Sequence, residues 1–365
     1  MKKLLPEVCT IQYGFPFDSA KFSDSNGMPL IRIRDVVRGY SETYTTEEYK
    51  SEYIVHENDL LIGMDGEFNI AKWGKTPALL NQRVCRLAPK DSIEKDYLFY
   101  FMPIALKRIE EKTPFVTVKH LSAKELNKIE IPVLSLEEQR KIAETLSKVD
   151  KLIAFRDQQL AKLDELVKAR FVEMFENVTE ENALENLCHF IDYRGKTPEK
   201  SDSGLPFITA KNIRMHYMSF DTQEFISKEN YDKVMTRGIP KVGDVVFTTE
   251  APLGNVCRIP QFDTDFYIGQ RIITMQTKLL NPVYLEYALS SDDFKRKLVG
   301  KSSGSTVTGI RSKLLGKLTI PVPSKGLQNQ FAAFVERVDK QKQTVQQSLE
   351  KLELMKKALM QEYFG

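Results

Sequence analysis

Hydrophobic residues recur at alternating spacings of three and four residues over a long stretch in the middle of the chain. The stretch follows Ser135, where the sequence S-L-E-E has the spacing of a helix-capping box. Arg156 and Arg170 interrupt the apolar seam, whose members are Ile142, Leu146, Val149, Ile153, Leu160, Leu163, Val167 and Met174. A heptad seam of this length predicts one long helix over residues 135–176, which needs a partner helix to cover its seam.

The same pattern returns over residues 324–365. Lys342 and Lys356 interrupt a seam formed by Phe331, Val335, Val338, Val345, Leu349, Leu352, Leu359 and Tyr363. Because two helices of matching pattern lie in one chain, we expect them to form an antiparallel coiled coil that relates the two halves by a pseudo-two-fold axis. Ordinary helix-bundle core and a coiled coil between two copies of the chain are the alternatives.

An internal repeat accounts for this similarity. A shift of about 189 residues places residues 117–175 on residues 306–364 without a gap. The preceding parts match more loosely, with GMPLIRIRDV on GLPFITAKNI and Asn81-Gln82-Arg83 on Gly269-Gln270-Arg271. The repeating unit is therefore half of the molecule.

Each half begins with a globular part in which short apolar runs, typical of buried strands, alternate with helical stretches. The runs are bounded by Gly, Asp, Asn and Pro, and an Ile-Pro-Val sequence precedes each long helix. The sequence thus predicts an α+β protein with two mixed α/β domains in tandem, separated by the two long antiparallel helices. The expected boundaries are 1–134 for the first domain, 135–176 for the first helix, 177–323 for the second domain and 324–365 for the second helix.

Charge is concentrated locally rather than over the whole chain. The 365 residues contain 53 Lys and Arg against 50 Asp and Glu, so a net charge of +3 does not by itself indicate a nucleic-acid-binding protein. Residues 294–317, however, contain no acidic residue and seven cations around the sequence S-S-G-S-T: Lys295, Arg296, Lys297, Lys301, Arg311, Lys313 and Lys317. Such a segment suits phosphate binding, and a solvated helix face is an equally good interpretation.

Several classes of protein are disfavoured by what the sequence lacks. The apolar start MKKLL stops at Pro6, and no run is long enough for a membrane helix, so we expect a cytoplasmic protein. The cysteines at positions 9, 85, 188 and 257 have no metal-ligand or disulfide spacing. Because phosphate-binding loops and zinc-protease motifs are also absent, we expect no cofactor and no metal.

The ordered motifs of both halves resemble the specificity subunit of Type I restriction-modification systems. The resemblance rests on P-V-L-S-L-E-E-Q-R-K-I-A at residues 132–143 and its echo from residue 321. It also rests on residues 29–35, 59–66 and 79–83 in the first half, and on residues 193–198, 211–213, 243–246 and 254–256 in the second. It covers essentially the whole chain.

This resemblance implies a non-catalytic subunit that reads DNA. Each globular part would be a target-recognition domain for one half of a bipartite site in double-stranded DNA, and the helices would set the spacer. Two methyltransferase (M) subunits would dock along the helices, and restriction/translocase (R) subunits would complete the enzyme. A metal-dependent nuclease and a coiled-coil scaffold without DNA binding are the rival functions.

Candidate contact residues follow from side-chain chemistry. Cations and amides suit base edges and phosphates, which gives Arg32, Arg34, Lys196, Lys211, Asn212, Arg214, Lys301 and Ser303. Arg83 and Arg271 occupy equivalent turns and are either DNA contacts or structural corners. Asp65 and Glu250 suit cytosine N4 or simple turn chemistry. For docking of M subunits, the apolar candidates are Phe155, Phe171, Phe175, Phe334 and Phe364, with core packing as the alternative.

Overall fold

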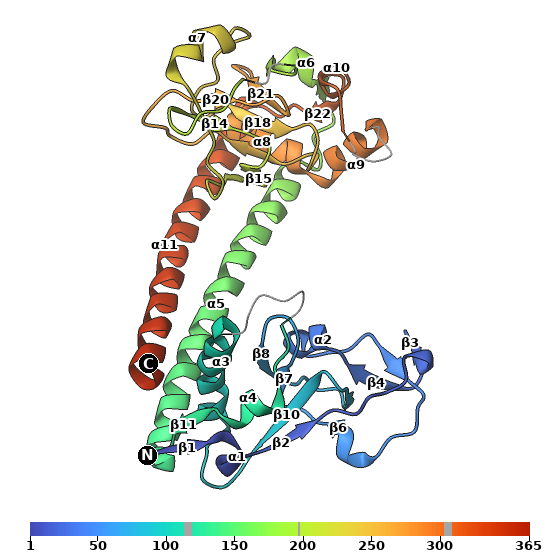
Figure 1. Cartoon of the computed structure of the whole chain (residues 1–365). Coiled ribbons are helices and arrows are strands. Elements are labelled where there is room, and N and C mark those ends of the chain that lie inside the picture. Colours follow the sequence, from blue (N-terminus) through green and yellow to red (C-terminus); the bar gives the residue numbers. More distant parts are fainter. Residues whose placement is uncertain (113–118, 196–197, 303–308) are drawn as a thin grey trace. The chain divides into compact units, whose positions relative to one another are not determined.

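The computed structural model describes residues 1–112, 119–195, 198–302 and 309–365. Its contacts divide the chain into two compact units, each with its own globular part and its own stretch of both long helices (Figure 1). Unit 1 contains residues 1–157 together with 347–365, and unit 2 contains residues 158–346. Both units mix helices and strands, as the sequence predicts.

Both predicted long helices are present, as α5 (Leu136–Phe175) and α11 (Lys325–Phe364). The capping box at the start of α5 is confirmed, because Glu138 N donates to Ser135 Oγ (3.3 Å) and Ser135 N donates to Glu138 Oε2 (3.1 Å). These bonds satisfy backbone groups that the first turn of a helix leaves without partners.

The helices run antiparallel within each unit, and most charged interruptions of the seam bridge them. In unit 1, Lys356 Nζ lies 2.7 Å from Asp150 Oδ1, and Arg156 Nε donates to Ser348 Oγ (3.2 Å). In unit 2, Lys342 pairs with Asp164. Residue numbers rise along one helix as they fall along the other in these pairs, which shows that the helices are antiparallel. Each helix therefore finds the expected partner helix within the same chain.

The main sheet of unit 1 has four antiparallel strands in the order β2-β10-β7-β8. Their bounds are Cys9–Tyr13, Val84–Pro89, Leu60–Gly63 and Asn69–Lys72. A second sheet has the order β3-β5-β4-β9-β6, with bounds Phe22–Ser23, Tyr44–Thr45, Met28–Ile31, Ala78–Leu80 and Ile54–Val55. β1 (Lys2–Leu4) pairs with β11 (Glu130–Pro132), and the helices are α1 (Leu5–Val8), α2 (Ile33–Arg38), α3 (Lys95–Lys112) and α4 (Ala123–Asn127).

Unit 2 repeats this arrangement. Its main sheet has the order β13-β21-β18-β19, with bounds His189–Asp192, Ile272–Gln276, Val245–Thr248 and Val256–Arg258. The second sheet, β17-β14-β20, has bounds Phe225–Ile226, Leu205–Ile208 and Tyr267–Ile268, and β12 (Glu181–Ala183) pairs with β22 (Thr319–Pro321). A hairpin joins β15 (Ile213–Arg214) to β16 (Tyr217–Met218), and the helices are α6 (Leu184–Leu187), α7 (Tyr231–Val234), α8 (Pro282–Ser290), α9 (Asp292–Lys301) and α10 (Ser312–Gly316). Short 3-10 helices lie at Ser19–Lys21, Ser51–Tyr53 and Lys228–Asn230.

An equivalent aromatic contact joins each globular part to the end of a long helix. In unit 1 the Phe364 ring lies 5.2 Å from that of Tyr97, and in unit 2 the Phe175 ring lies 4.8 Å from that of Tyr284. Both phenylalanines are buried. Both tyrosine hydroxyls also donate to the proline carbonyl of the Ile-Pro-Val sequence, so the same residues hold sheet and helix together in each unit.

The four cysteines lie in the interior of the two units. All four cysteines are free and buried, and burial raises the pKa of each thiol to about 12, which keeps it protonated. Among the described residues, no helix is both long and apolar enough to cross a lipid bilayer.

Candidate nucleic-acid interface

A carboxylate–arginine pair occupies the same corner of the main sheet in both units. In unit 1, Asp65 follows β7 and lies 3.5 Å from Arg83 Nε, and it also contacts His120 Nδ1. In unit 2, Glu250 follows β18, and its Oε1 lies 2.8 Å from Arg271 Nε. We call these two sites the acid–arginine corners.

The backbone places each corner in the same way. Met64 N donates to Arg83 O, and at the equivalent position Thr249 N donates to Arg271 O, both at 3.0 Å. These bonds extend the β7–β10 and β18–β21 pairing by one residue, so each arginine turn faces the acidic residue beyond the strand end. Both arginine side chains are about half exposed. Arg83 and Arg271, which the repeat linked only by sequence, therefore occupy the same position of the main sheet, each in its own unit.

The corner of unit 2 lines a hollow of about 400 Å³. Three guanidinium groups and one carboxylate surround it, contributed by Arg194, Arg271, Arg311 and Glu250. Arginine keeps its charge at every pH that a folded protein meets, so these groups sum to a positive site. Guanidinium groups in this setting bind phosphate oxygens or the O6 and N7 edge of guanine. The neighbouring Gln270 amide adds a donor and an acceptor of the kind that pairs with adenine.

A second equivalent feature follows the strands β4 and β14. Asp35 Oδ2 accepts from Arg32 N, and Asn212 Oδ1 accepts from Thr209 N, both at 2.9 Å. Asp35 and Asn212 are buried. The residues just before them in the sequence, Arg34 and Lys211, are exposed cations in the same position of the two loops, and they remain candidates for contact with DNA.

Asn212 itself has a structural role in this conformation. Its amide donates to Ser219 O (3.0 Å) and Thr222 O (2.8 Å), and only 3% of the residue is exposed. Both amide hydrogens are therefore used within the domain, and Asn212 shapes the loop that carries Lys211. Arg214 also bends back, donating from Nη1 to Lys211 O (2.6 Å), whereas Arg32 is exposed at the start of α2.

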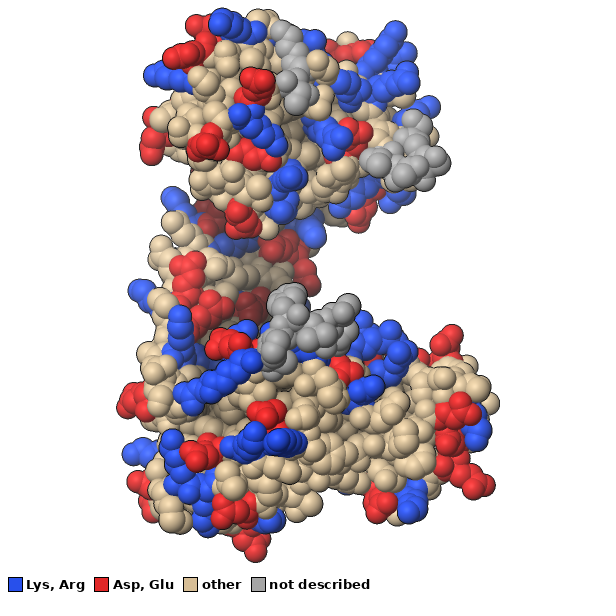
Figure 2. Space-filling view, in the orientation of Figure 1, with Lys and Arg blue, Asp and Glu red and all other residues tan. Residues whose placement is uncertain are grey.

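The basic segment over residues 294–317 is less positive than its sequence indicates. Lys295 and Arg296 pair with Asp292 and Asp293 one turn earlier on α9. Lys297 Nζ lies 2.7 Å from Glu181 Oε1, a hydrogen bond that lowers the pKa of Glu181. The remaining cations are exposed and form no ion pair among the described residues: Lys301, Arg311, Lys313 and Lys317. Figure 2 shows Lys and Arg side chains gathered on the side of unit 2 that carries α9 and α10. Lys196 and Ser303 lie outside the described residues.

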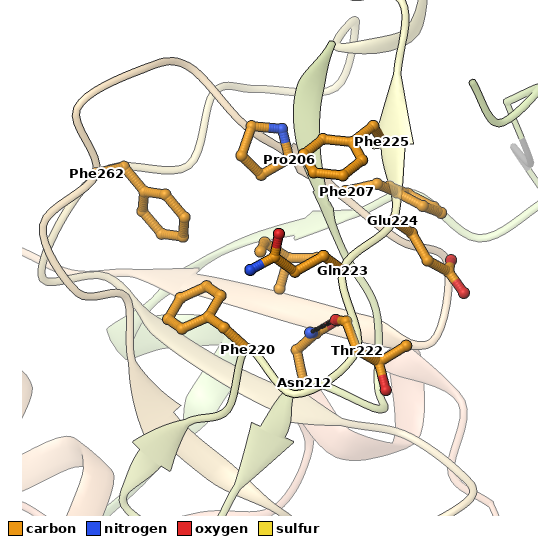
Figure 3. Close-up of a pocket in the computed structure, with 10 residues that line it drawn as sticks. Pro206, Phe207, Asn212, Phe220, Thr222, Gln223, Glu224, Phe225 and Phe262 are labelled. Atoms are coloured by element: carbon orange, nitrogen blue, oxygen red, sulfur yellow. Dashed lines mark hydrogen bonds between the residues drawn. The ribbon is translucent and has the colours of Figure 1, made fainter. Parts of the chain in front are cut away.

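Sequence reasoning missed an aromatic pocket of about 120 Å³ in unit 2, between β14 and the following loop (Figure 3). The Gln223 amide points toward the rings of Phe220 and Phe262, which meet edge to face at 5.7 Å. Phe220 is 42% exposed, so its ring is accessible to a ligand from solvent. An exposed glutamine beside aromatic rings can hydrogen-bond and stack on nucleobases. The rings come from segments far apart in the sequence, so no local motif reveals the pocket.

The apolar docking candidates separate by burial. Phe155 is 56% exposed on α5, with Leu152 exposed one turn away. Phe171 and Phe334 are half-buried, and the Phe171 ring contacts Phe331 at 5.4 Å. Phe175 and Phe364 lie inside the cores of their own units, which is the alternative role that the sequence left open.

A protein-family model and several known proteins match this chain. The model of the Type I restriction modification DNA specificity domain matches residues 1–165 and 179–354. The chain is 29% identical to the Type I restriction enzyme EcoBI specificity subunit of Escherichia coli, over 92% of this chain and 78% of that protein. It is 24% identical to the MjaVIII specificity subunit of Methanocaldococcus jannaschii, over 91% of this chain and 87% of that protein.

Solved structures show the same fold. The crystal structure of a Type I restriction-modification S subunit from M. genitalium has a TM-score of 0.60 and 17% identity, and it covers 100% of this chain and 96% of that one. A structure described as the basis of complex assembly and conformational transition of the Type I system has the same TM-score and identity and covers 97% of that chain.

Proposed function

Because this chain belongs to the family of Type I restriction-modification DNA specificity subunits, which select DNA and leave catalysis to partner subunits, we propose that it reads a bipartite site in double-stranded DNA. Residues 1–134 and 177–323 are the proposed recognition domains, one for each half-site. The observation that carries the proposal is the acid–arginine corner, which occurs once in each unit. Two copies of one surface in one chain suit two half-sites in one DNA molecule.

The corner offers a direct route to recognition. The carboxylate holds the guanidinium of Arg83 or Arg271 in one orientation before DNA arrives, which reduces the entropy lost on binding. The exposed Lys and Arg side chains nearby neutralise phosphates, so affinity falls as salt concentration rises. A scaffold that does not touch DNA would lack this salt dependence.

The long helices are the proposed docking surface for two M subunits, with Phe155 as its most exposed apolar anchor. Phe334, on α11 beside the guanidinium of Arg170 at 5.9 Å, is a second candidate. R subunits would join the resulting complex. Methylation and cleavage would then take place at the site that this chain selects.

Long-read mapping of methylated adenines in the source cell tests the proposal. We expect a split motif with a fixed spacer to lose its methylation when the gene is deleted and to regain it when the wild-type gene is restored. Restoring the gene as Arg271→Gln should recover less methylation than restoring Arg296→Gln, an exposed arginine that already pairs with Asp293. A methylation pattern unchanged by the deletion would contradict the proposal.

A further inference from the structure

The two long helices carry an aspartate at the same position of the repeat, Asp150 and Asp339, each within the sequence V-D-K. In unit 1, Tyr100 Oη on α3 donates to Asp150 Oδ2 (2.9 Å), and Lys356 Nζ on α11 lies 2.7 Å from Asp150 Oδ1. One half-buried carboxylate on α5 thus connects both long helices to the globular part of unit 1.

Asp339 makes the corresponding connection in unit 2 through a chain of charged groups. Its Oδ2 lies 3.7 Å from Arg258 Nη2, on β19. Arg258 Nε donates to Glu286 Oε2 on α8 (2.6 Å), and Glu286 Oε1 contacts His216 Nδ1 (2.9 Å). His216 forms the turn of the β15–β16 hairpin and stacks on the Tyr287 ring at 4.3 Å. The helix aspartate is therefore connected to the loop region that carries Lys211 and Arg214.

The globular parts use different positions of the repeat to contact the helix aspartate, Tyr100 in unit 1 and Arg258 in unit 2. Lys72 faces the first residue of β7 and Arg258 faces the first residue of β18. In unit 1, Lys72 lies over the Phe99 ring (5.1 Å), one residue before Tyr100. In unit 2, Arg258 pairs with Glu286, one residue before Tyr287. Despite these differences, the helix aspartate contacts the globular part in both units.

Charged contacts of this kind are a costly way to attach a domain to a helix. Glu286 is only 1% exposed, and burying a charge is unfavourable unless its partners are in good geometry. Aromatic packing already attaches each domain to the helix ends, but the hydrophobic effect that drives this packing is non-directional. Hydrogen-bonded and paired charges, by contrast, favour one angle between the elements that carry them.

We propose that Asp150 and Asp339 are positioning residues that fix the angle at which each recognition domain stands on its own helix segments, and thereby restrict the spacer length accepted between half-sites. The inference rests on the proposed function. A rotation of about 13°, acting over half of the roughly 30 Å diameter of a small domain, moves a surface by about 3.4 Å, the rise of one base pair. A change of angle of this size covers the added rise of one base pair, and the twist of roughly 35° that the base pair also adds is left for the DNA to absorb.

The test uses the full chain in complex with its M subunits and the bipartite site found by methylation mapping. Duplexes carry the natural spacer or a spacer changed by one base pair, and the ratio of their dissociation constants is measured. We expect Asp150→Asn, Asp339→Asn and Tyr100→Phe to reduce this ratio by about threefold or more, because each removes a contact that holds the angle. Glu144→Gln and Glu336→Gln, exposed on the same helices, serve as matched controls and should keep the wild-type ratio.

A role in stability alone would lower affinity for all spacers in the same proportion and leave the ratio unchanged, and that result would overturn the inference. Tyr100→Phe removes a single hydroxyl and keeps the ring, so it decides the question for unit 1 if an aspartate variant does not fold. If the wild-type complex binds no duplex with two half-sites, the proposed function itself is wrong. If the wild-type complex binds such duplexes and the variants keep its spacer preference, only the inference about the aspartates is wrong.

Discussion

At the scale of single residues, the orientation of an arginine depends on the acidic residue across the sheet corner. Arg271 and Glu250 form a 2.8 Å ion pair whose members are both partly exposed, so the pair adds little to folding stability. The main effect of the pair is therefore to hold the Arg271 guanidinium in one position. The same reasoning applies to Arg83 beside Asp65 in unit 1.

We expect Arg271→Gln to weaken DNA binding by the assembled complex in one of two recognisable ways. If the guanidinium binds a phosphate, the slope of log affinity against log salt should fall by about one. If it binds guanine, the slope of log affinity against log salt should stay unchanged. The free energy by which the complex prefers the correct base pair at one position should then fall by about 1–3 kcal/mol. Titrations at several salt concentrations measure both quantities. Arg296→Gln is the control, and an equal loss in both variants would contradict a special role for the corner.

At the scale of elements, each long helix begins beside one globular part and ends in the core of the other unit. α5 follows β11 of unit 1, yet its last residue, Phe175, belongs to the core of unit 2. α11 follows β22 of unit 2, yet Phe364 belongs to the core of unit 1. The stability of each unit therefore depends on a helix that starts in the other.

This exchange predicts crossed effects of two equivalent substitutions. Phe364→Ala should destabilise unit 1, and Phe175→Ala should destabilise unit 2, each by about 3–5 kcal/mol, because a buried ring is replaced by a cavity. Hydrogen exchange should report the loss in α3 for the first variant and in α8 for the second. Phe155→Ala, at an exposed site on α5, should change neither. Loss of protection in the opposite unit would disprove the crossed dependence.

The elements also show what can be predicted from sequence and what cannot. The long helices are predictable because a heptad seam is a local pattern, and even its charged interruptions have a use, since Lys342 and Lys356 pair across the helices. Strands of two residues, such as β5 and β20, exist only through partners distant in the sequence.

The same limit applies to the candidate site. Arg83 and Arg271 could be found because the repeat aligns their turns. The role of Asn212 could not, because it depends on the carbonyl groups of Ser219 and Thr222 lying within reach. Polar residue type alone does not distinguish a side chain that faces solvent from one that shapes a loop.

At the scale of the whole molecule, the proposed function requires assembly with M subunits, and Phe155 is the clearest test of the proposed docking surface. A charge at this exposed position should weaken an apolar interface without disturbing the core. We therefore expect Phe155→Asp to reduce co-purification of M subunits while the thermal unfolding of the isolated chain stays close to wild type. Asp157→Asn, exposed two residues away, is the control. Intact assembly of the Phe155 variant would exclude this surface.

The division of unit 1 into residues 1–157 and 347–365 also has a consequence for synthesis. At about 5–20 residues per second, a ribosome needs roughly 10 to 40 seconds to add residues 158–346. During that interval Tyr97 and Phe101 have left the ribosome, but the Phe364 ring that packs against both has not been made. Unit 2 is continuous in sequence and can close as soon as it emerges. The part of the protein that is synthesised first is therefore completed last, and until then its apolar face is open to chaperones and to other nascent chains.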